Sequence, residues 1–337
     1  MAKIRSLALS DIKKINKLVS FTDAGVRSFL DGIVLPYPLT LVYKILPMRL
    51  KFMPESYVLY DKKDLLAYIS IKKHNNCYKK WKLSKLLMAN NSYNAGLMLI
   101  QYTISKLGAK GANTFLAEIE ETQGELIRLF TEGAGFRQCS RQQIWKYNNT
   151  ELGQFEPLAD LKFRPFKNSD AISVANLFND CILTHFRPSL SQDKREYYDN
   201  IFSGLSANSE FKYIFEDNNS KQIICYFSLR TNDNKNYLAD IIISKGYEHL
   251  FERALAYGLK MVQKRTKNSE FFVLNRYYLQ TANYFEQILK EKAFTPSTST
   301  VILVKDLFRT VSAENDVKNA LFYTDIHSTP VFKSFFS

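Results

Sequence analysis

The chain has 337 residues, of which 46% are hydrophobic and 23% are charged. This composition excludes a disordered or fibrous chain, and the length suffices for two domains that each bury a core. The net charge of +13 is uneven: residues 1–150 hold 23 Lys and Arg against 11 Asp and Glu (+12), and the remainder holds 23 against 22 (+1). We therefore expect an anionic partner to meet the first half, although a charged surface also serves solubility alone.

Cysteine spacing and hydropathy exclude several further classes of protein. Cys77, Cys139, Cys181 and Cys225 form no Cys-x-x-Cys pair, and none has a histidine at metal-ligand spacing. We therefore expect a reduced, cytoplasmic protein with neither a disulfide framework nor a metal site. The longest mostly apolar stretch, residues 32–47, is too short to cross a bilayer, so no transmembrane segment is predicted.

The pattern of apolar residues predicts a mixed succession of strands and helices in the first half. Alternating or continuous apolar runs predict strands at residues 4–9, 56–60, 65–71, 78–89, 114–119 and 143–147. Helical spacing predicts helices at residues 12–19, 99–107 and 122–132. Gly108 and Gly111 end the second of these helices, as glycine commonly does at a helix C-terminus.

The same order recurs in the second half at a nearly constant offset. Ser169 follows Ser10 by 159 positions (169 − 10), and Phe294 follows Phe136 by 158 (294 − 136). The recurring elements are strands at 161–166, 211–215, 223–229, 237–243, 271–274 and 300–305, and helices at 172–178, 247–264 and 280–290. An offset held over a whole domain length indicates duplication. The sequence predicts an α/β protein of two mixed-sheet units, each ending in its own last strand, with domains 1–150 and 160–309, a linker at 151–159 and a tail at 310–337.

This order of elements resembles that of the GNAT superfamily of N-acetyltransferases. The resemblance covers residues 3–148 and 160–307, and it rests on element order and on the Gly-Phe or Ala-Phe pair before each last strand. It implies two GNAT-like folds in tandem, in which two central strands splay apart and acetyl-coenzyme A (acetyl-CoA) enters between them. The coenzyme's pyrophosphate would then sit on unpaired backbone N–H groups at the positive N-terminus of the next helix.

The resemblance assigns a coenzyme site to the turn after the third central strand of the first half. Its residues are Met88, Asn94, Ala95, Gly96 and Leu97. The family's loop carries a Gln or Arg before two small residues, and this chain keeps small residues but has no Gln or Arg in frame. The second half offers Gly246 with Glu248, whose charge opposes a pyrophosphate. The first half is therefore the better candidate, and the alternative is that Gly96 only shapes a turn.

The acid–base residues depart further from the family's pattern. Where the family often has a Tyr that protonates the departing thiolate, this chain has Phe130 and Thr131. Glu118 and Glu120 lie on or just past strand 114–119, and alternation sends both side chains to one face. A carboxylate there could take the proton of an amine, and the alternative is a solvated strand end. The four histidines are scattered and support neither a catalytic triad nor a metal site.

Two further features of the sequence are each compatible with more than one kind of partner. Six lysines gather on the predicted hairpin after residue 71, together with Tyr78 and Trp81, and these are Lys72, Lys73, Lys79, Lys80, Lys82 and Lys85. Such a cluster could grip nucleic acid, meet the coenzyme's 3′-phosphate or remain solvated. The apolar segment 32–48 could line an acceptor site, pack between domains or touch a membrane surface.

We predict an N-acetyltransferase that moves the acetyl group of acetyl-CoA to an unidentified small-molecule or peptide amine. The alternative is a catalytically inactive tandem GNAT-like module that contacts RNA, and nucleic acid is the less favoured partner.

Overall fold

The computed structural model describes residues 2–11, 14–15, 54–74, 79–89, 92–148, 163–198, 209–217, 219–265 and 269–307. The strands of these residues are β1 Ala2–Ser6, β2 Glu55–Asp61, β3 Asp64–Lys73, β4 Lys80–Met88, β5 Thr114–Glu120, β6 Arg137–Tyr147, β7 Arg164–Pro165, β8 Ser209–Glu216, β9 Ile223–Thr231, β10 Asn236–Ile243, β11 Glu270–Arg276 and β12 Phe294–Asp306. The helices are α3 Tyr93–Ala109, α4 Gly124–Arg128, α5 Ala171–Cys181, α6 Arg187–Leu190, α7 Leu250–Arg265 and α8 Ala282–Glu291, and a π-helical turn at Leu129–Gly133 continues α4.

The predicted elements appear in the predicted order, with their ends shifted by a few residues. Most of the predicted helix at 12–19, the apolar segment 32–48, the linker 151–159 and the tail 310–337 lie outside the described residues. The domain limits at 150 and 160 therefore stay a prediction.

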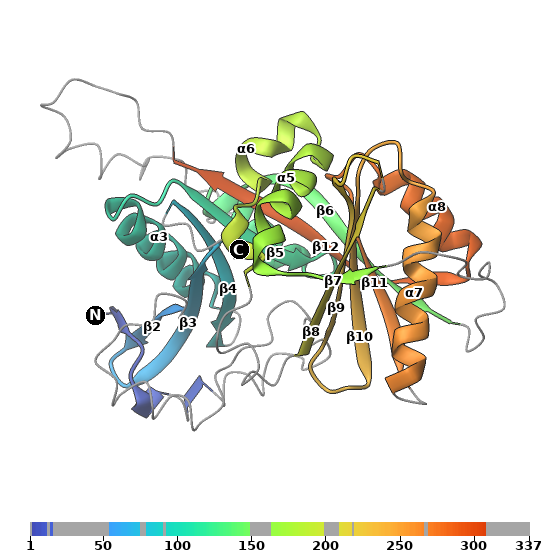
Figure 1. The fold of residues 1–337 in the computed structure, drawn as a ribbon. Coiled ribbons are helices and arrows are strands. Elements are labelled where there is room, and N and C mark those ends of the chain that lie inside the picture. The colour runs from blue at the N-terminus through green and yellow to red at the C-terminus, as the bar shows by residue number, and fades with distance from the viewer. Residues whose placement is uncertain are drawn as a thin grey trace, which may run out of the picture.

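All twelve strands join one mixed sheet whose order is nearly symmetric about its centre (Figure 1). The order is β1-β2-β3-β4-β5-β12-β6-β11-β10-β9-β8-β7. Each side of the centre holds an antiparallel meander followed by one parallel pair, β4 with β5 and β10 with β11. The helix between the two parallel strands is long in both halves, α3 in the first and α7 in the second, as the repeated pattern predicted.

The two last strands are exchanged between the halves, which corrects the expectation that each unit ends in its own last strand. Strand β12 comes from the second half of the chain but pairs antiparallel with β5 of the first. Strand β6 comes from the first half but pairs antiparallel with β11 of the second. The two exchanged strands also pair with each other, from Phe294 opposite Tyr147 to Val304 opposite Arg137.

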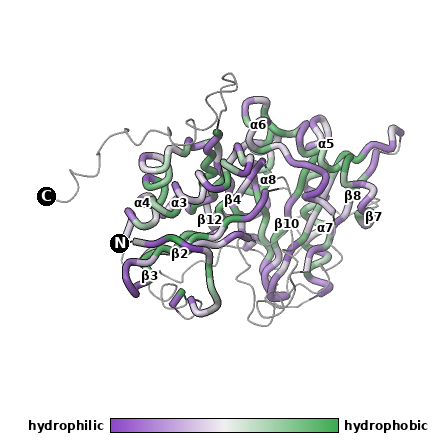
Figure 2. The backbone as a smooth tube through the Cα atoms, turned by 90° about the vertical axis from the view of Figure 1, so that its left-hand side faces the viewer, coloured by the Kyte–Doolittle hydropathy of each residue, from purple (hydrophilic) through white to green (hydrophobic). Residues whose placement is uncertain are grey.

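The exchange also completes the two hydrophobic cores. Val301 and Leu303 of β12 are buried with the residues of α3 in the core of the first half. Trp145 and Tyr147 of β6 are buried with the residues of α7 and α8 in the core of the second half. Because successive side chains of a strand point to opposite faces, Ile302 packs into a third core against α5 on the other face of the sheet. Helices α5 and α6 lie over the centre of the sheet on this face (Figures 1 and 2).

The turns before the exchanged strands keep the same backbone in both halves. Gly135 has a φ of 69°, and Ala293, which takes its place in the second half, has a φ of 61°. This left-handed region suits glycine and strains alanine. The repeated Gly-Phe and Ala-Phe pairs thus mark a turn whose conformation the fold requires even where the residue does not favour it.

No helix among the described residues combines the length and the apolar character that crossing a bilayer requires.

Trp145 belongs to the first half in sequence but is buried in the core of the second half. We therefore predict that Trp145→Ala destabilises the second half. Trp145 is 2% exposed, so its removal should cost about 3–5 kcal/mol of unfolding free energy. Unfolding in guanidinium chloride measures this by circular dichroism, and the fluorescence of Trp81 reports the first half in the same variant. Both signals should shift together because β6 and β12 bind the halves to each other.

The matched control is Ile172→Ala, which removes a side chain that is 51% exposed and should change stability by less than about 0.5 kcal/mol. If the Trp81 transition of Trp145→Ala stays where it is in the parent protein, the halves unfold independently and the exchanged strands do not couple them.

Candidate active site

The parallel strands β4 and β5 separate partway along their length. Their pairing runs from Lys80 opposite Thr114 to Leu83 opposite Ala117 and ends there. Strand β4 continues to Met88 and β5 to Glu120 without pairing with each other. The facing backbone groups of the two strands beyond Leu83 and Ala117 therefore open onto a V-shaped gap rather than onto each other.

A β-bulge at Ser84 stands where the two strands part. Ser70 and Ile71 of β3 pair with Lys85 and Leu83 of β4. Ser84, which lies between these two, therefore has no pairing partner on β3. The bulge reverses the alternation: Trp81 and Leu83 before it, and Leu86 and Met88 after it, all pack into the core beneath α3. The residue that a bulge adds is left out of the ladder, and bulges are common beside active sites. The hydroxyl Oγ of Ser84 is buried and has no hydrogen-bond partner among the described residues.

The predicted coenzyme residues come together at the open end of this gap. Met88 is the last residue of β4, and residues 94–97 form the first turn of α3. The N–H groups of Ala95 and Gly96 donate to the carbonyl of Ser92 at 2.9 and 3.1 Å. The first two N–H groups of the helix, those of Tyr93 and Asn94, have no acceptor within the helix. Asn94 is exposed.

Gly96 has a packing role that the sequence did not indicate. It is buried in the helix, and a Cβ atom there would lie 2.3 Å from the Sδ atom of Met88. The glycine therefore lets α3 lie close to the end of β4. A neighbouring contact is similar, since a Cβ at Gly133 would lie 3.3 Å from Leu97. These contacts set the distance between the helix N-terminus and the gap.

The second half repeats the separation of the parallel strands but not the bulge. Strands β10 and β11 pair from Asn236 to Asp240 and then continue to Ile243 and Arg276 without pairing with each other. Strand β10 pairs with β9 in an unbroken register from Leu238 to Ile243, without a bulge. In front of α7, the N–H of Gly246 donates to both carboxylate oxygens of Glu248 at 3.0 and 2.9 Å. The Glu248 carboxylate therefore already binds the amide at the turn that was considered as a second pyrophosphate site.

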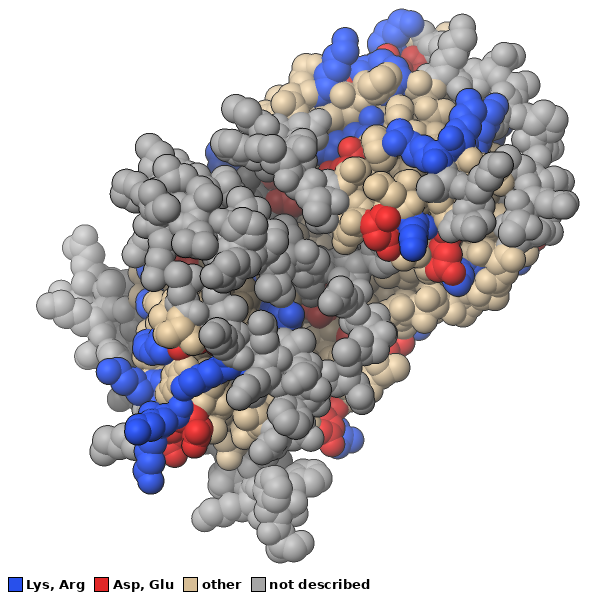
Figure 3. All heavy atoms as spheres, turned by 90° about the horizontal axis from the view of Figure 1, so that it is seen from below, with Lys and Arg blue, Asp and Glu red and all other residues tan. Residues whose placement is uncertain are grey.

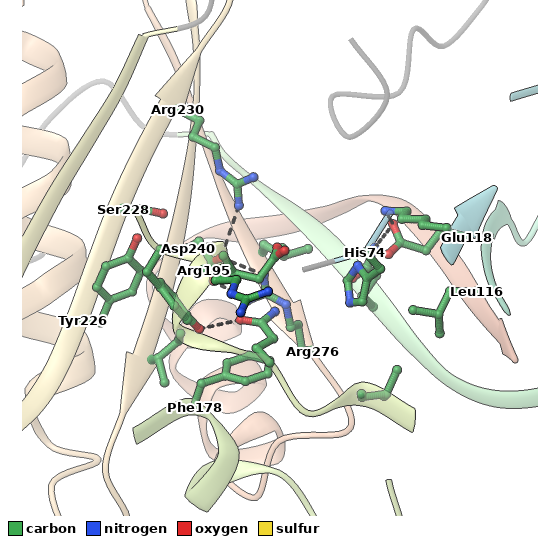
Figure 4. A pocket seen from close by; sticks show the side chains of 18 of the residues that line it. His74, Leu116, Glu118, Phe178, Arg195, Tyr226, Ser228, Arg230, Asp240 and Arg276 are labelled. Carbon is green, nitrogen blue, oxygen red and sulfur yellow. Dashed lines mark hydrogen bonds and ion pairs between the residues drawn. The ribbon is translucent and has the colours of Figure 1, made fainter. Parts of the chain in front are cut away.

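A cavity of about 390 Å³ lies between the halves, against α5 and the turn after α6. The first half contributes residues of β3, β4 and β5, and the second half contributes residues of β8 to β11. Figure 4 shows two groups of polar side chains in it: His74 and Glu118 at one end, and Arg230, Asp240 and Arg276 at the other. Glu118 is the first residue of β5 beyond the last pair with β4, so the cavity reaches the base of the gap between these strands.

Glu118 is held as an ion pair. Its Oε2 atom lies 2.7 Å from Nζ of Lys82 and accepts a hydrogen bond of 3.1 Å from Nε2 of Gln142. Burial alone would raise the pKa of Glu118, but the Lys82 ammonium outweighs it and the pKa lies below its usual range. Burial together with Lys82 lowers the pKa of His74 to about 3, so this imidazole is neutral. Glu120, the second predicted base, ends β5 and is not among the described residues that line the cavity.

Glu196 is a carboxyl group that sequence reasoning missed. It lies in the turn Lys194–Glu196, lines the cavity and is reached by solvent. Enclosure by the cavity walls raises the pKa of Glu196 to about 7, because Lys72, Lys82 and Arg230 offset the lost hydration only in part. Nothing in the charged run 193–196 distinguishes it from an ordinary solvated turn.

The other end of the cavity is built around Asp240. This buried carboxylate accepts hydrogen bonds from both terminal nitrogens of Arg276, one at 2.6 Å, and from Nη2 of Arg230 at 3.2 Å. Arg276 lies on β11 two residues beyond Leu274, the partner of Asp240 on that strand. In the first half, Lys82 of β4 is opposite Leu116 of β5, and Glu118 lies two residues beyond Leu116. The same two strand positions therefore hold an ion pair there too, but with the base on the first strand and the acid on the second. Both halves thus place an ion pair across their parallel strands on the cavity side.

The basic hairpin does not form one outward-facing strip. Lys72, Lys73 and Lys82 line the cavity. Nζ of Lys80 donates to the carbonyls of Ser189 and Ser191 across the interface between the halves, each at 3.2 Å. On the face shown in Figure 3, Lys and Arg side chains occur over both halves with Asp and Glu among them. The predicted lysine cluster therefore serves the contact between the halves more than an outer surface.

Within the described ranges, no three His, Cys, Asp or Glu side chains come together in a way that could hold a metal ion.

Several solved structures share this fold. A GCN5-related N-acetyltransferase from Sphaerobacter thermophilus has a TM-score of 0.58 at 11% sequence identity, over 93% of this chain and 98% of its own. The tandem GNAT protein from the clavulanic acid biosynthesis pathway has a TM-score of 0.59 at 11% identity, over 92% of this chain and all (100%) of its own. A protein from Enterococcus faecalis V583 described as a probable N-acyltransferase has a TM-score of 0.54 at 8% identity, over 91% and 72%.

The sequence matches no protein-family model and no curated protein. A likeness to solved structures at these identities establishes the fold, and two of these structures match along almost their whole length. The chain therefore has the mixed α/β fold of the tandem GNAT proteins.

Proposed function

We propose that this protein transfers an acyl group from acetyl-CoA, bound by the first half, to an amine bound in the cavity between the halves. The observation that carries the proposal is the bulge at Ser84, from which β4 runs apart from β5 and ends at Met88 against the first turn of α3. The second half has an unbroken β10 and fills its own anion position with Glu248. This difference favours a single acyl-donor site, with the second half as a wall for the acceptor.

The residues of the first half fit the donor. The N–H groups of Tyr93 and Asn94, at the positive end of α3, suit the pyrophosphate. The unpaired edge of β4 from Ser84 to Met88 suits the amide-bearing arm of the coenzyme, because it offers backbone donors and acceptors in an extended line. The buried hydroxyl of Ser84 finds no partner in the part of the chain that the structure describes, and a polar group of the donor would satisfy it. When bound, acetyl-CoA supplies the acyl group to be transferred.

The acceptor amine must lose a proton, and Glu196 is the residue we propose to take it. A general base works best when its pKa lies near the working pH, which a pKa of about 7 satisfies. The sequence predicted Glu118 as the general base, but its ion pair with Lys82 lowers its pKa and makes it a weaker proton acceptor than Glu196. We propose that Glu118 instead holds Lys82 and Gln142 at the base of the gap. Glu120 stays a prediction at the end of β5.

The proposal also places the protein in the cytoplasm, since acetyl-CoA is available there and free thiols such as Cys181 and Cys225 persist. The acceptor would be a small molecule or the amine of a peptide that fits the cavity.

The first test is the binding of coenzyme A to Asn94→Glu, measured by isothermal titration calorimetry. A carboxylate in the first turn of α3 favours the helix, so the variant should fold as stably as the parent. The same charge should repel the pyrophosphate and weaken binding at least tenfold. Gln101→Glu is the matched control, because it adds the same charge at an exposed position of α3 about 10 Å farther along the helix.

Equal binding of coenzyme A by the parent and Asn94→Glu would exclude the N-terminus of α3 as the pyrophosphate site. Failure of the parent to bind coenzyme A would reject acyl transfer by the first half.

The second test is the pH dependence of acyl transfer, followed as the release of free coenzyme A thiol with a panel of amines. Glu196 must be ionised to accept a proton, so kcat/KM should rise as the pH rises through about 7 and fall below it. Glu196→Gln should lose this limb of the profile and lower kcat/KM by about 10²-fold or more. Glu291→Gln, an exposed substitution on α8, is the control and should leave the profile unchanged. A Glu196→Gln profile that matches the parent would exclude this residue as the proton acceptor.

A further inference from the structure

We infer that the Asp240 end of the cavity binds a carboxylate or phosphate group of the acceptor, so that the acceptor is a small anionic amine. The inference rests on the proposed function, since it names the class of acceptor for the same cavity. Its evidence is the charge, the hydrogen bonding and the layout of the second half's wall.

The cavity wall carries an excess of positive charge. Among the described residues, seven Lys and Arg side chains and four Asp and Glu side chains line it, a difference of three. His74 adds no charge because its pKa lies at about 3, and Glu196 is only partly ionised near neutral pH. In a confined space of low dielectric, unbalanced charge is costly and attracts a counter-ion. A small anion is the ligand that would balance this wall.

Arg230 has binding capacity that the protein does not use. Asp240 is shared between two guanidinium groups, those of Arg276 and Arg230. The Nε atom of Arg230 is buried and has no hydrogen-bond partner among the described residues. Oε1 of Glu210 lies 3.7 Å from it, which is an ion pair beyond hydrogen-bond distance. A buried N–H left without an acceptor is costly, and a guanidinium matches the oxygen spacing of a carboxylate or phosphate.

The layout of the cavity gives the ligand a direction. Figure 4 shows Arg230 with Asp240 and Arg276 at the end formed by the second half, and Glu118 at the end formed by the first. Glu118, already paired with Lys82, lies at the base of the gap where the acyl donor is proposed to bind. An acceptor with its anion on Arg230 would therefore present its amine toward the gap.

The size of the cavity restricts the ligand to a small molecule. A volume of about 390 Å³ lies in the usual range for small-molecule sites. An RNA strand needs an open, continuous groove along its backbone. The excess positive charge of this wall therefore suits a small anion rather than a polynucleotide.

The test measures the binding of two probes, sulfate and succinate, by calorimetry to the full chain at pH 6.5, together with coenzyme A in a separate titration. Arg230→Gln should weaken both probes at least tenfold. Arg230→Lys keeps the charge but loses the planar fork, and it should fall between the parent and Arg230→Gln. Arg253→Gln removes the same charge from an exposed position on α7 and should bind both probes as the parent does. Equal binding of the probes to the parent and Arg230→Gln would overturn the inference.

Acyl-transfer assays then identify the source of the anionic group. Amines that bear a carboxylate, such as glutamate, and amines that bear a phosphate, such as phosphoethanolamine, are compared with ethanolamine and spermidine. We expect one anionic class to have the lowest KM, and Arg230→Gln to raise that KM at least tenfold while kcat changes less than about threefold. Preference for spermidine or ethanolamine would overturn the inference.

The two proposals fail separately. If coenzyme A binds but neither sulfate nor succinate does, the anionic acceptor is rejected and acyl transfer stands. If the anions bind in an Arg230-dependent way but coenzyme A does not, the anion site stands and acyl transfer is rejected.

Discussion

The exchange of β6 and β12 is the constraint on which the rest of the structure depends. Each strand leaves its own half, pairs with the last central strand of the other and buries side chains in the other's core. The halves therefore meet along a continuous, hydrogen-bonded sheet rather than across a surface of side chains. Such a junction fixes their relative position more tightly than a polar domain interface would. The cavity between them consequently has walls from both halves, which the shared sheet connects.

The two halves that this junction holds together differ in detail at their parallel strands. The first half has a bulge at Ser84, and the Tyr93 and Asn94 N–H groups at the start of α3 have no acceptor within the helix. The second half has a regular β10, and Glu248 accepts the amide N–H of Gly246 in front of α7. The ion pairs of opposite polarity, Lys82 with Glu118 and Asp240 with Arg276, show how far the two walls have diverged.

The elements could be predicted from the sequence because burial sets their periodicity. The strand at residues 114–119 and the helices α3 and α7 follow from apolar spacing alone, and the repeated offset revealed two copies. The exchange of strands could not be predicted, since alternation in β12 tells which face is buried but not which strand lies beside it. The bulge did leave a trace: apolar residues shift from odd positions at Trp81 and Leu83 to even positions at Leu86 and Met88.

The candidate site was harder to predict than the fold. The turn at residues 94–97 was located by resemblance, yet Gly96 packs against Met88 rather than shaping an open loop. Glu118 was predicted as a general base, which stays a prediction, and its ion-pair partner Lys82 was taken for part of a surface cluster. Glu196 carried no signal, because its pKa is raised by burial against cavity walls that come from distant parts of the chain. Lys72 and Lys82, more than 100 positions away, oppose this rise only in part. Environments that two halves build together cannot be inferred from a local pattern in either.

Hydrogen–deuterium exchange in the presence and absence of coenzyme A tests the central claim most directly, because it locates binding on the chain. The account predicts slower exchange at the unpaired edge of β4 from Ser84 to Met88 and in the first turn of α3. It predicts no change at residues 246–250, in front of α7, where Glu248 already holds the amide of Gly246. Protection at residues 246–250 without protection at α3 would contradict the assignment of the donor site to the first half.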